Sequence, residues 1–221
     1  MAAMSAVAHD EGFLPLHRIE ALTDGIFAVA MTLLVIELKL PDHAAVNANG
    51  GLALALAALI PKAIAWTLSF FVLALFWIGH HRVFAFVRQA DGPLVALTLF
   101  ELAAVSLMPF SSALSGEYGR EMLSQIVFST NMALLGVAAL LVTRYVHAHP
   151  ELGSLSTARY RGSRLRIAGV ILISVLAAVI GVLLPIPAMG NMAFMLMAVI
   201  SPLSRRLERR AASGGAPLAS A

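Results

Sequence analysis

The stretch that decides the fold is HRIEALTDGIFAVAMTLLVIELKLP, from His17 to Pro41. It carries charged residues near its start and then runs through apolar residues from Ile26 to Ile36. Its length matches the roughly 20 residues that a helix needs to cross a bilayer core of about 30 Å. Asp24 is the residue to explain, because an ionisable side chain at membrane depth is costly and usually functional.

The charged and apolar residues of this stretch fall on different sides of a helix. At about 100° per residue, the side that carries the acid is formed by Glu20, Asp24, Phe27 and Met31. The opposite side consists of residues within about 60° of one line, namely Arg18, Leu22, Gly25, Val29, Thr32, Leu33 and Ile36. This apolar face with one hydroxyl suits lipid, a neighbouring helix or a pore built from several copies, and geometry leaves the three open.

The chain of 221 residues is too apolar for a soluble domain. Hydrophobic residues make up 60% and charged residues 12%, with a mean hydropathy of +0.88, whereas a soluble domain carries about 25% charged residues. We therefore expect an all-α integral membrane protein folded as one compact bundle. The lack of cysteine excludes disulfides, thiolate nucleophiles and thiolate metal sites. Membrane topology explains the arginine clusters better than nucleic-acid binding does, so no nucleic-acid partner is expected.

The apolar runs predict six transmembrane helices within one domain, residues 17–203. The expected spans cover 17–41, 61 or 63 to 81, 93–114, 122–142, 167–184 and 187–203. A short separate helix is expected over 52–60, and Pro109 is expected to kink the third span. Residues 1–16 are expected to form a cytoplasmic lead-in, and residues 204–221 a basic, disordered tail.

The orientation follows from the distribution of Lys and Arg. Loops on the side of the N-terminus hold twelve arginines, whereas the opposite side holds Lys39, Lys62 and Arg120, and these make up all 15 basic residues. Basic residues accumulate in cytoplasmic loops. We expect a multi-pass protein of the cell membrane with both termini in the cytoplasm.

Three motifs resemble those of one channel family. RIEALTD, residues 18–24, resembles the R-x-x-x-F-S-D signature of the lysosomal potassium channel family, the transmembrane protein 175 type, whose bacterial members carry one six-helix unit. The second motif comprises the pairs PK, SF and FW and the triplet HHR within residues 61–82, and the third is MPFSS, residues 108–112. Leu22 and Thr23 stand where the signature has Phe and Ser. Thr23 keeps the hydroxyl, whereas Leu22 lacks the aromatic ring.

The resemblance implies a homotetramer whose first helices line a central pore for potassium. In the family, the pore positions lie five, nine and twelve residues after the signature Asp, with a threonine at eight. Here these positions are Val29, Leu33, Ile36 and Thr32. The helical projection had placed the same four residues on one face, opposite Asp24. From the residues alone, the alternative is that this stripe packs inside the core of the bundle.

The expected pore is a hydrophobic constriction. Rings of branched apolar side chains can gate by dewetting or make an ion shed water, and the Thr32 hydroxyl is the polar contact nearby. The chain lacks a TVGYG-type loop, so selection by backbone carbonyls is not expected. We expect a modest preference for potassium over sodium, because the hydration shell of potassium costs less to strip.

The signature residues are expected to form a structural or gating network. We predict a hydrogen-bonded cluster of Asp24, Thr23 and His80, with Trp77 packed over it, because buried polar groups need partners. Arg18 is expected to pair with Asp24 of the same or an adjacent chain. The alternative is that Arg18 reaches lipid headgroups and that His80 is an interfacial residue.

Glu101, in the third span, has no partner in its own turn. It is either a buried acid held by the second span or a proton-sensitive site. Of the two readings, the simple polar contact is favoured.

No metal, cofactor or catalytic site is expected. His147 and His149 are two residues apart and lack a further ligand nearby, and the chain has no G-x-S-x-G, H-E-x-x-H or phosphate-binding glycine loop. Potassium is expected as the permeant ion, and the basic clusters 159–166 and 205–210 as contacts for anionic lipid.

Two other function classes remain open. One is a secondary transporter or proton-permeable carrier that uses Asp24, His80 and Glu101 as a relay. The other is a non-conducting membrane scaffold.

Overall fold

The computed structural model describes residues 13–183 as a helical bundle with one very short sheet. The elements in chain order are β1 (Phe13–Leu14), α1 (Leu16–Ile36), α2 (His43–Ala48), α3 (Leu52–Ala57), α4 (Ile60–Phe84), β2 (Ala90–Asp91), α5 (Gly92–Ser106), α6 (Met108–Glu117), α7 (Met122–Ala148) and α8 (Thr157–Leu183). Within this part of the chain, five helical segments are long and apolar enough to cross a membrane.

The observed helices match five of the six expected spans. The short helix before the second span is α3, and α4 begins at Ile60 with Pro61 in its first turn, where the missing N–H of proline costs nothing. The third span is broken at Leu107 into α5 and α6, next to Pro109, which cannot donate to the helix ladder. The sixth expected span, 187–203, the tail 204–221 and residues 1–12 of the lead-in lie outside the described residues.

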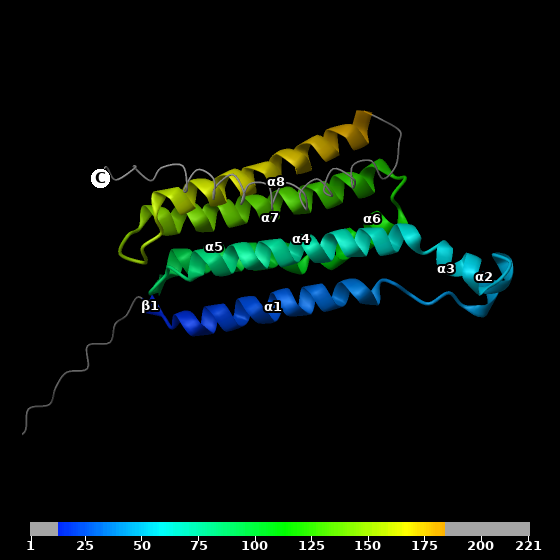
Figure 1. The fold of residues 1–221 in the computed structure, drawn as a ribbon, viewed down its shortest axis with the longest axis horizontal. Helices are drawn as coiled ribbons and strands as arrows, with labels where there is room; N and C mark the ends of the chain where they lie inside the picture. The colour runs from blue at the N-terminus through cyan, green and yellow to red at the C-terminus, as the bar shows by residue number, and fades with distance from the viewer. Residues whose placement is uncertain (1–12, 184–221) are drawn as a thin grey trace, which may run out of the picture.

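The long helices run side by side (Figure 1). α8 lies along α7, α7 packs against α5 and α6, and α4 packs against α6. α1 lies at the edge of the bundle away from α8, against α4, α5 and α6 (Figure 1). α2 and α3 extend beyond one end, and β1 pairs with β2 at the other end, in antiparallel register. One side of α1 is therefore left without a neighbouring described helix.

Two apolar clusters form the core. The larger one contains Phe27 and Leu34 of α1, Leu73 of α4, Leu102 of α5 and Met132 of α7. The smaller one lies at the end of the bundle where β1 and β2 pair. There the loop after α7 crosses the end of α4 so closely that a Cβ on Gly153 would lie 2.2 Å from the Phe86 carbonyl oxygen. Only glycine allows that approach.

Buried polar side chains between α4, α6 and α7 bond to one another. Ser69 donates to Ser112 at 2.8 Å, and Asn131 donates to Ser111 at 3.0 Å. Small polar residues let helices approach closely and hydrogen-bond across their contact, which is how helices associate where lipid supplies no hydrophobic drive. These contacts fix the lateral position of α4, and α4 in turn supports α1.

The core contacts of α5 predict a selective loss of stability. Leu102→Ala is expected to lower the free energy of unfolding by about 2–5 kcal/mol, because this side chain is 2% exposed. An SDS titration of the purified protein in micelles measures the loss. Leu99→Ala is the matched control, because Leu99 lies on the same helix and is 48% exposed. Equal losses in the two variants would contradict this description of the core.

Candidate pore-lining face and its polar contacts

α1 divides into a buried side and an exposed side. Its buried residues recur at helical spacing and are Ile19, Thr23, Phe27, Ala30 and Leu34. Their spacing of three and four residues gives one continuous side that meets α4, α5 and α6. The rotation of α1 about its own axis is thereby fixed.

The exposed side of α1 carries the stripe that the sequence singled out. We call apolar stripe the set Leu22, Gly25, Val29, Thr32, Leu33 and Ile36, all of them exposed in the single chain. Val29 is 56% and Ile36 is 62% exposed. The alternative that this stripe packs within the core of its own chain is therefore wrong for the described bundle, because the other side of α1 fills that place. A surface of this kind meets lipid or a second copy of the chain.

Thr32 is the polar member of the apolar stripe. Its hydroxyl donates to the Val29 carbonyl one turn earlier, at 2.8 Å. The proton is thus directed back along the helix, while the hydroxyl oxygen keeps lone pairs that a cation can meet. The stripe offers one oxygen per helix among branched apolar side chains.

Asp24 is held by α4. The indole Nε1 of Trp77 donates to its carboxylate at 2.8 Å. The expectation that the partner of Asp24 sits on another helix is confirmed. This bond joins the signature segment of α1 to the second span, on the side away from Val29.

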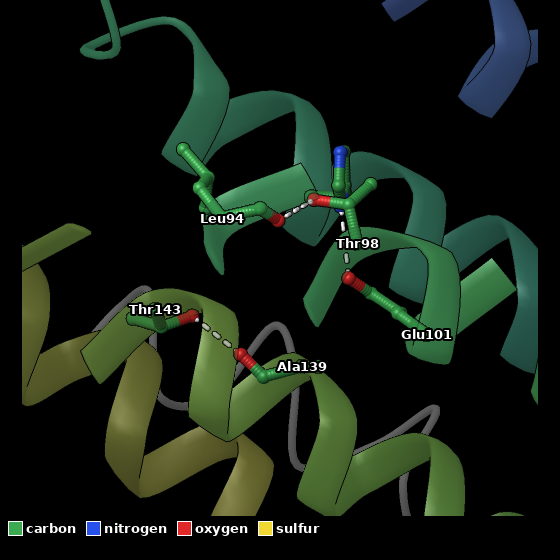
Figure 2. A network of polar contacts seen from close by, with 6 residues as sticks. Leu94, Thr98, Glu101, Ala139 and Thr143 are labelled. Atoms are coloured by element: carbon green, nitrogen blue, oxygen red, sulfur yellow. Dashed lines mark hydrogen bonds and ion pairs between the residues drawn. The ribbon is translucent and has the colours of Figure 1, made fainter. Parts of the chain in front are cut away.

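His80 does not join Asp24, and that part of the expected cluster is wrong. His80 Nδ1 instead lies 3.0 Å from the carboxylate of Glu101 on α5, the acid that Figure 2 labels, and its ring stacks on Phe84 at 4.1 Å. His80 follows Trp77 by three residues, which place it about 4.5 Å further along the helix axis with its side chain about 60° away around the helix. The two side chains therefore meet different helices. The expectation that the second span holds Glu101 as a buried acid is confirmed, since Glu101 is 1% exposed.

Two signature residues lack the contacts that were expected of them. The buried hydroxyl oxygen of Thr23 has no hydrogen-bond partner in the described part of the chain. Within the same part, Arg18 forms no ion pair with Asp24. The pairing of Arg18 with Asp24 of an adjacent copy stays a prediction.

The histidines after the fourth span serve packing. His147 lies 3.3 Å from the Leu155 carbonyl and stacks on Tyr160, whereas His149 lies 3.0 Å from the Tyr145 carbonyl. Their ring nitrogens thus turn to different backbone oxygens. Among residues 13–183 no group of three or more potential metal ligands comes together.

The contact between Tyr145 and Asp91 was not predicted from the sequence. Tyr145 donates to Asp91 at 2.6 Å, while the other carboxylate oxygen of Asp91 accepts from the Leu94 N–H and caps α5. The Asp-Gly-Pro order at residues 91–93 is a helix-start signal, but nothing in the sequence pairs it with Tyr145.

A protein-family model matches the part of the chain that holds the signature and the second-span motif. The model of the family described as endosomal/lysosomal potassium channel TMEM175 matches residues 18–109. That range begins at Arg18 and ends at Pro109, so it holds the signature, the second-span pairs and the start of MPFSS.

Known relatives agree over part of their length. A protein named potassium channel from Streptomyces collinus is 36% identical over 132 residues, which are 60% of this chain and 63% of that protein. The human endosomal/lysosomal proton channel TMEM175 is 32% identical over 109 residues, which are 47% of this chain and 22% of that protein. The matches thus span less than two thirds of either relative.

A solved structure covers more of the chain. The crystal structure of a lysosomal potassium-selective channel TMEM175 homolog from Chamaesiphon minutus is similar with a TM-score of 0.74 and 25% identity, over 86% of this chain and 97% of that one. Motif order, family model and fold agree. The chain is therefore similar to the endosomal/lysosomal potassium channel TMEM175 family over residues 18–109 and to a TMEM175 homolog in its fold.

Proposed function

We propose that the chain forms a potassium-permeable cation channel, a homotetramer whose α1 helices surround a hydrophobic pore. The observation that carries the proposal is the apolar stripe, which is exposed along a helix whose opposite side is buried in the bundle through Ile19, Thr23, Phe27, Ala30 and Leu34. The family is one of ion channels, and the chain is not an enzyme. Both termini are proposed to lie in the cytoplasm.

Self-association would explain why the apolar stripe is exposed in the single chain. Four copies arranged about an axis would bring four stripes together, with Val29, Thr32, Leu33 and Ile36 towards the axis. The rest of each bundle would then face lipid, as the many exposed leucines and valines of α8 suit. A symmetric ring of this kind needs only one repeated contact surface.

Conduction through such a ring depends on partial dehydration. An ion that passes branched apolar side chains loses water without a full replacement shell, and closely packed rings empty of water altogether. Potassium is favoured over sodium because its shell costs less to remove. The oxygen of Thr32 supplies a compensating contact inside the apolar section.

The Asp24–Trp77 bond sets how the stripe faces the axis. A hydrogen bond to a carboxylate is stronger than a neutral one, and this one ties α1 to α4 near the signature motif. Losing it would free α1 to rotate, and a rotation of about 60° would replace the stripe by other side chains. We assign Asp24 and Trp77 to positioning and not to ion contact.

A proton-permeable carrier is the second candidate, since His80 and Glu101 form a buried pair of titratable groups. A relay from Asp24 through His80 to Glu101 would need contact between the first two. Asp24 is bonded to Trp77 instead. The channel is therefore the better supported function.

The pore proposal predicts different effects for two valines of α1. In planar bilayers under a potassium/sodium gradient, Val29→Ala is expected to raise the unitary conductance and lower the potassium/sodium permeability ratio, because it widens an apolar ring. Val35→Ala is the matched control, since Val35 is also exposed, at 49%, but lies off the stripe. Equal changes in both variants, or a wild-type protein without currents, would contradict the proposal.

The positioning role predicts an energetic coupling between Asp24 and Trp77. A double-mutant cycle with Asp24→Ala and Trp77→Phe is expected to give about 1.5–3 kcal/mol of coupling in unfolding free energy, as for hydrogen bonds to charged groups. The same cycle with Glu20→Ala in place of Asp24→Ala should give almost none. Coupling absent from the first cycle, or tetramers and currents unaltered by Asp24→Ala, would rule out the positioning role.

A further inference from the structure

A cavity between α4 and α8 lies apart from the apolar stripe. It has a volume of about 130 Å³ and is lined by residues of α4, α5, α7 and α8. α8 packs along α7, and α4 packs along α1 and α6, so α4 and α8 form two walls with α7 behind them. Neither the pore proposal nor the Asp24–Trp77 bond uses this space.

The walls of the cavity are apolar over most of their length. Phe76 and Val83 of α4, Val142 of α7 and Val170 and Ile173 of α8 line it. A hydrocarbon chain would find ordinary van der Waals contacts there. Two glycines, Gly79 and Gly169, also line the cavity, and a Cβ on either would meet nothing within 4 Å.

Two arginines line the same cavity from its two walls. Arg82 follows the apolar part of α4, and Arg166 directly precedes the apolar run of α8 that begins at Ile167. Arg82 is exposed and forms no ion pair with another described residue. Arginines at the ends of apolar runs lie at the level of lipid headgroups, where a guanidinium binds a phosphate through two hydrogen bonds.

One ring nitrogen of His80, a residue of the cavity wall, is buried without a partner among the described residues. His80 lines the cavity and is 7% exposed, and its Nδ1 is engaged by Glu101. Its Nε2 is buried without any hydrogen-bond partner among the described residues. A buried polar atom of this kind is costly unless something bonds to it. Because Nε2 is buried, it does not contact a ligand in the cavity, and ligand binding there depends on the apolar wall and the two arginines.

We propose that this cavity binds an anionic glycerophospholipid, which lies in the inner leaflet given the cytoplasmic termini proposed above. The phosphate contacts Arg82 and Arg166, and the start of one acyl chain lies against Val142 and Val170. Charge complementarity selects an anionic lipid over a zwitterionic one.

The test measures how lipid changes the melting temperature of the full-length protein in detergent. Added phosphatidylglycerol is expected to raise the melting temperature by several degrees, because a ligand of the folded state stabilises it. Phosphatidylcholine and glycerol 3-phosphate are expected to raise it little. A rise with glycerol 3-phosphate alone as large as that with phosphatidylglycerol would overturn the proposal, since the site would then bind free anions.

Two sets of variants separate the site from general surface charge. Arg82→Gln with Arg166→Gln is expected to remove more than half of the phosphatidylglycerol shift. Arg88→Gln with Arg161→Gln removes as much charge outside the cavity and should leave the shift intact. Gly169→Leu fills the cavity without changing charge and should also remove the shift, whereas Gly169→Ala, which adds one methyl group, should preserve it.

Each remaining outcome overturns the proposal. A shift that survives in the Arg82/Arg166 double variant would place the lipid elsewhere. A shift that survives Gly169→Leu but not the double arginine variant would mean that the headgroup binds the surface and no chain enters. A wild-type protein that ignores phosphatidylglycerol would show that the cavity is closed to lipid.

Discussion

The structure depends on how α1 is held against the rest of the bundle. Phe27 and Leu34 bury one side of this helix in the core, and the Asp24–Trp77 bond fixes its signature segment to α4. Because a helix has only one rotation that satisfies both, the remaining side is determined as well. That side contains the apolar stripe. The exposure of Val29 and Ile36 is thus a consequence of where the buried side is anchored.

Several polar residues inside the bundle bond to a side chain of another helix, where lipid offers no partner. Ser69 meets Ser112, Asn131 meets Ser111, and His80 meets Glu101. Other buried hydroxyls, such as those of Thr98 and Thr143, bond to a carbonyl of their own helix. The bonds between side chains of different helices therefore hold the bundle together.

Much of this arrangement could be predicted from the sequence, because helices in a membrane are set by apolar length and by proline. The break near Pro109, the short helix before Pro61 and the split of α1 into two faces all follow from local patterns. The partner of His80 could not be predicted, since it depends on how α4 and α5 are rotated and shifted relative to each other. The side chains of Trp77 and His80 point about 60° apart around α4, so Trp77 bonds to Asp24 and His80 to Glu101. The cavity arises from the separation of α4 and α8, which no local pattern encodes.

The central claim is that the apolar stripe of α1 lines an ion pathway. The chain has no cysteine, so a single introduced thiol can be modified without background. Currents should be recorded from Ile36→Cys and Val35→Cys channels while a positively charged thiosulfonate reagent is applied. The account predicts rapid block at position 36, slowed by high potassium, and no block at position 35. Equal modification at both positions without loss of current would contradict it.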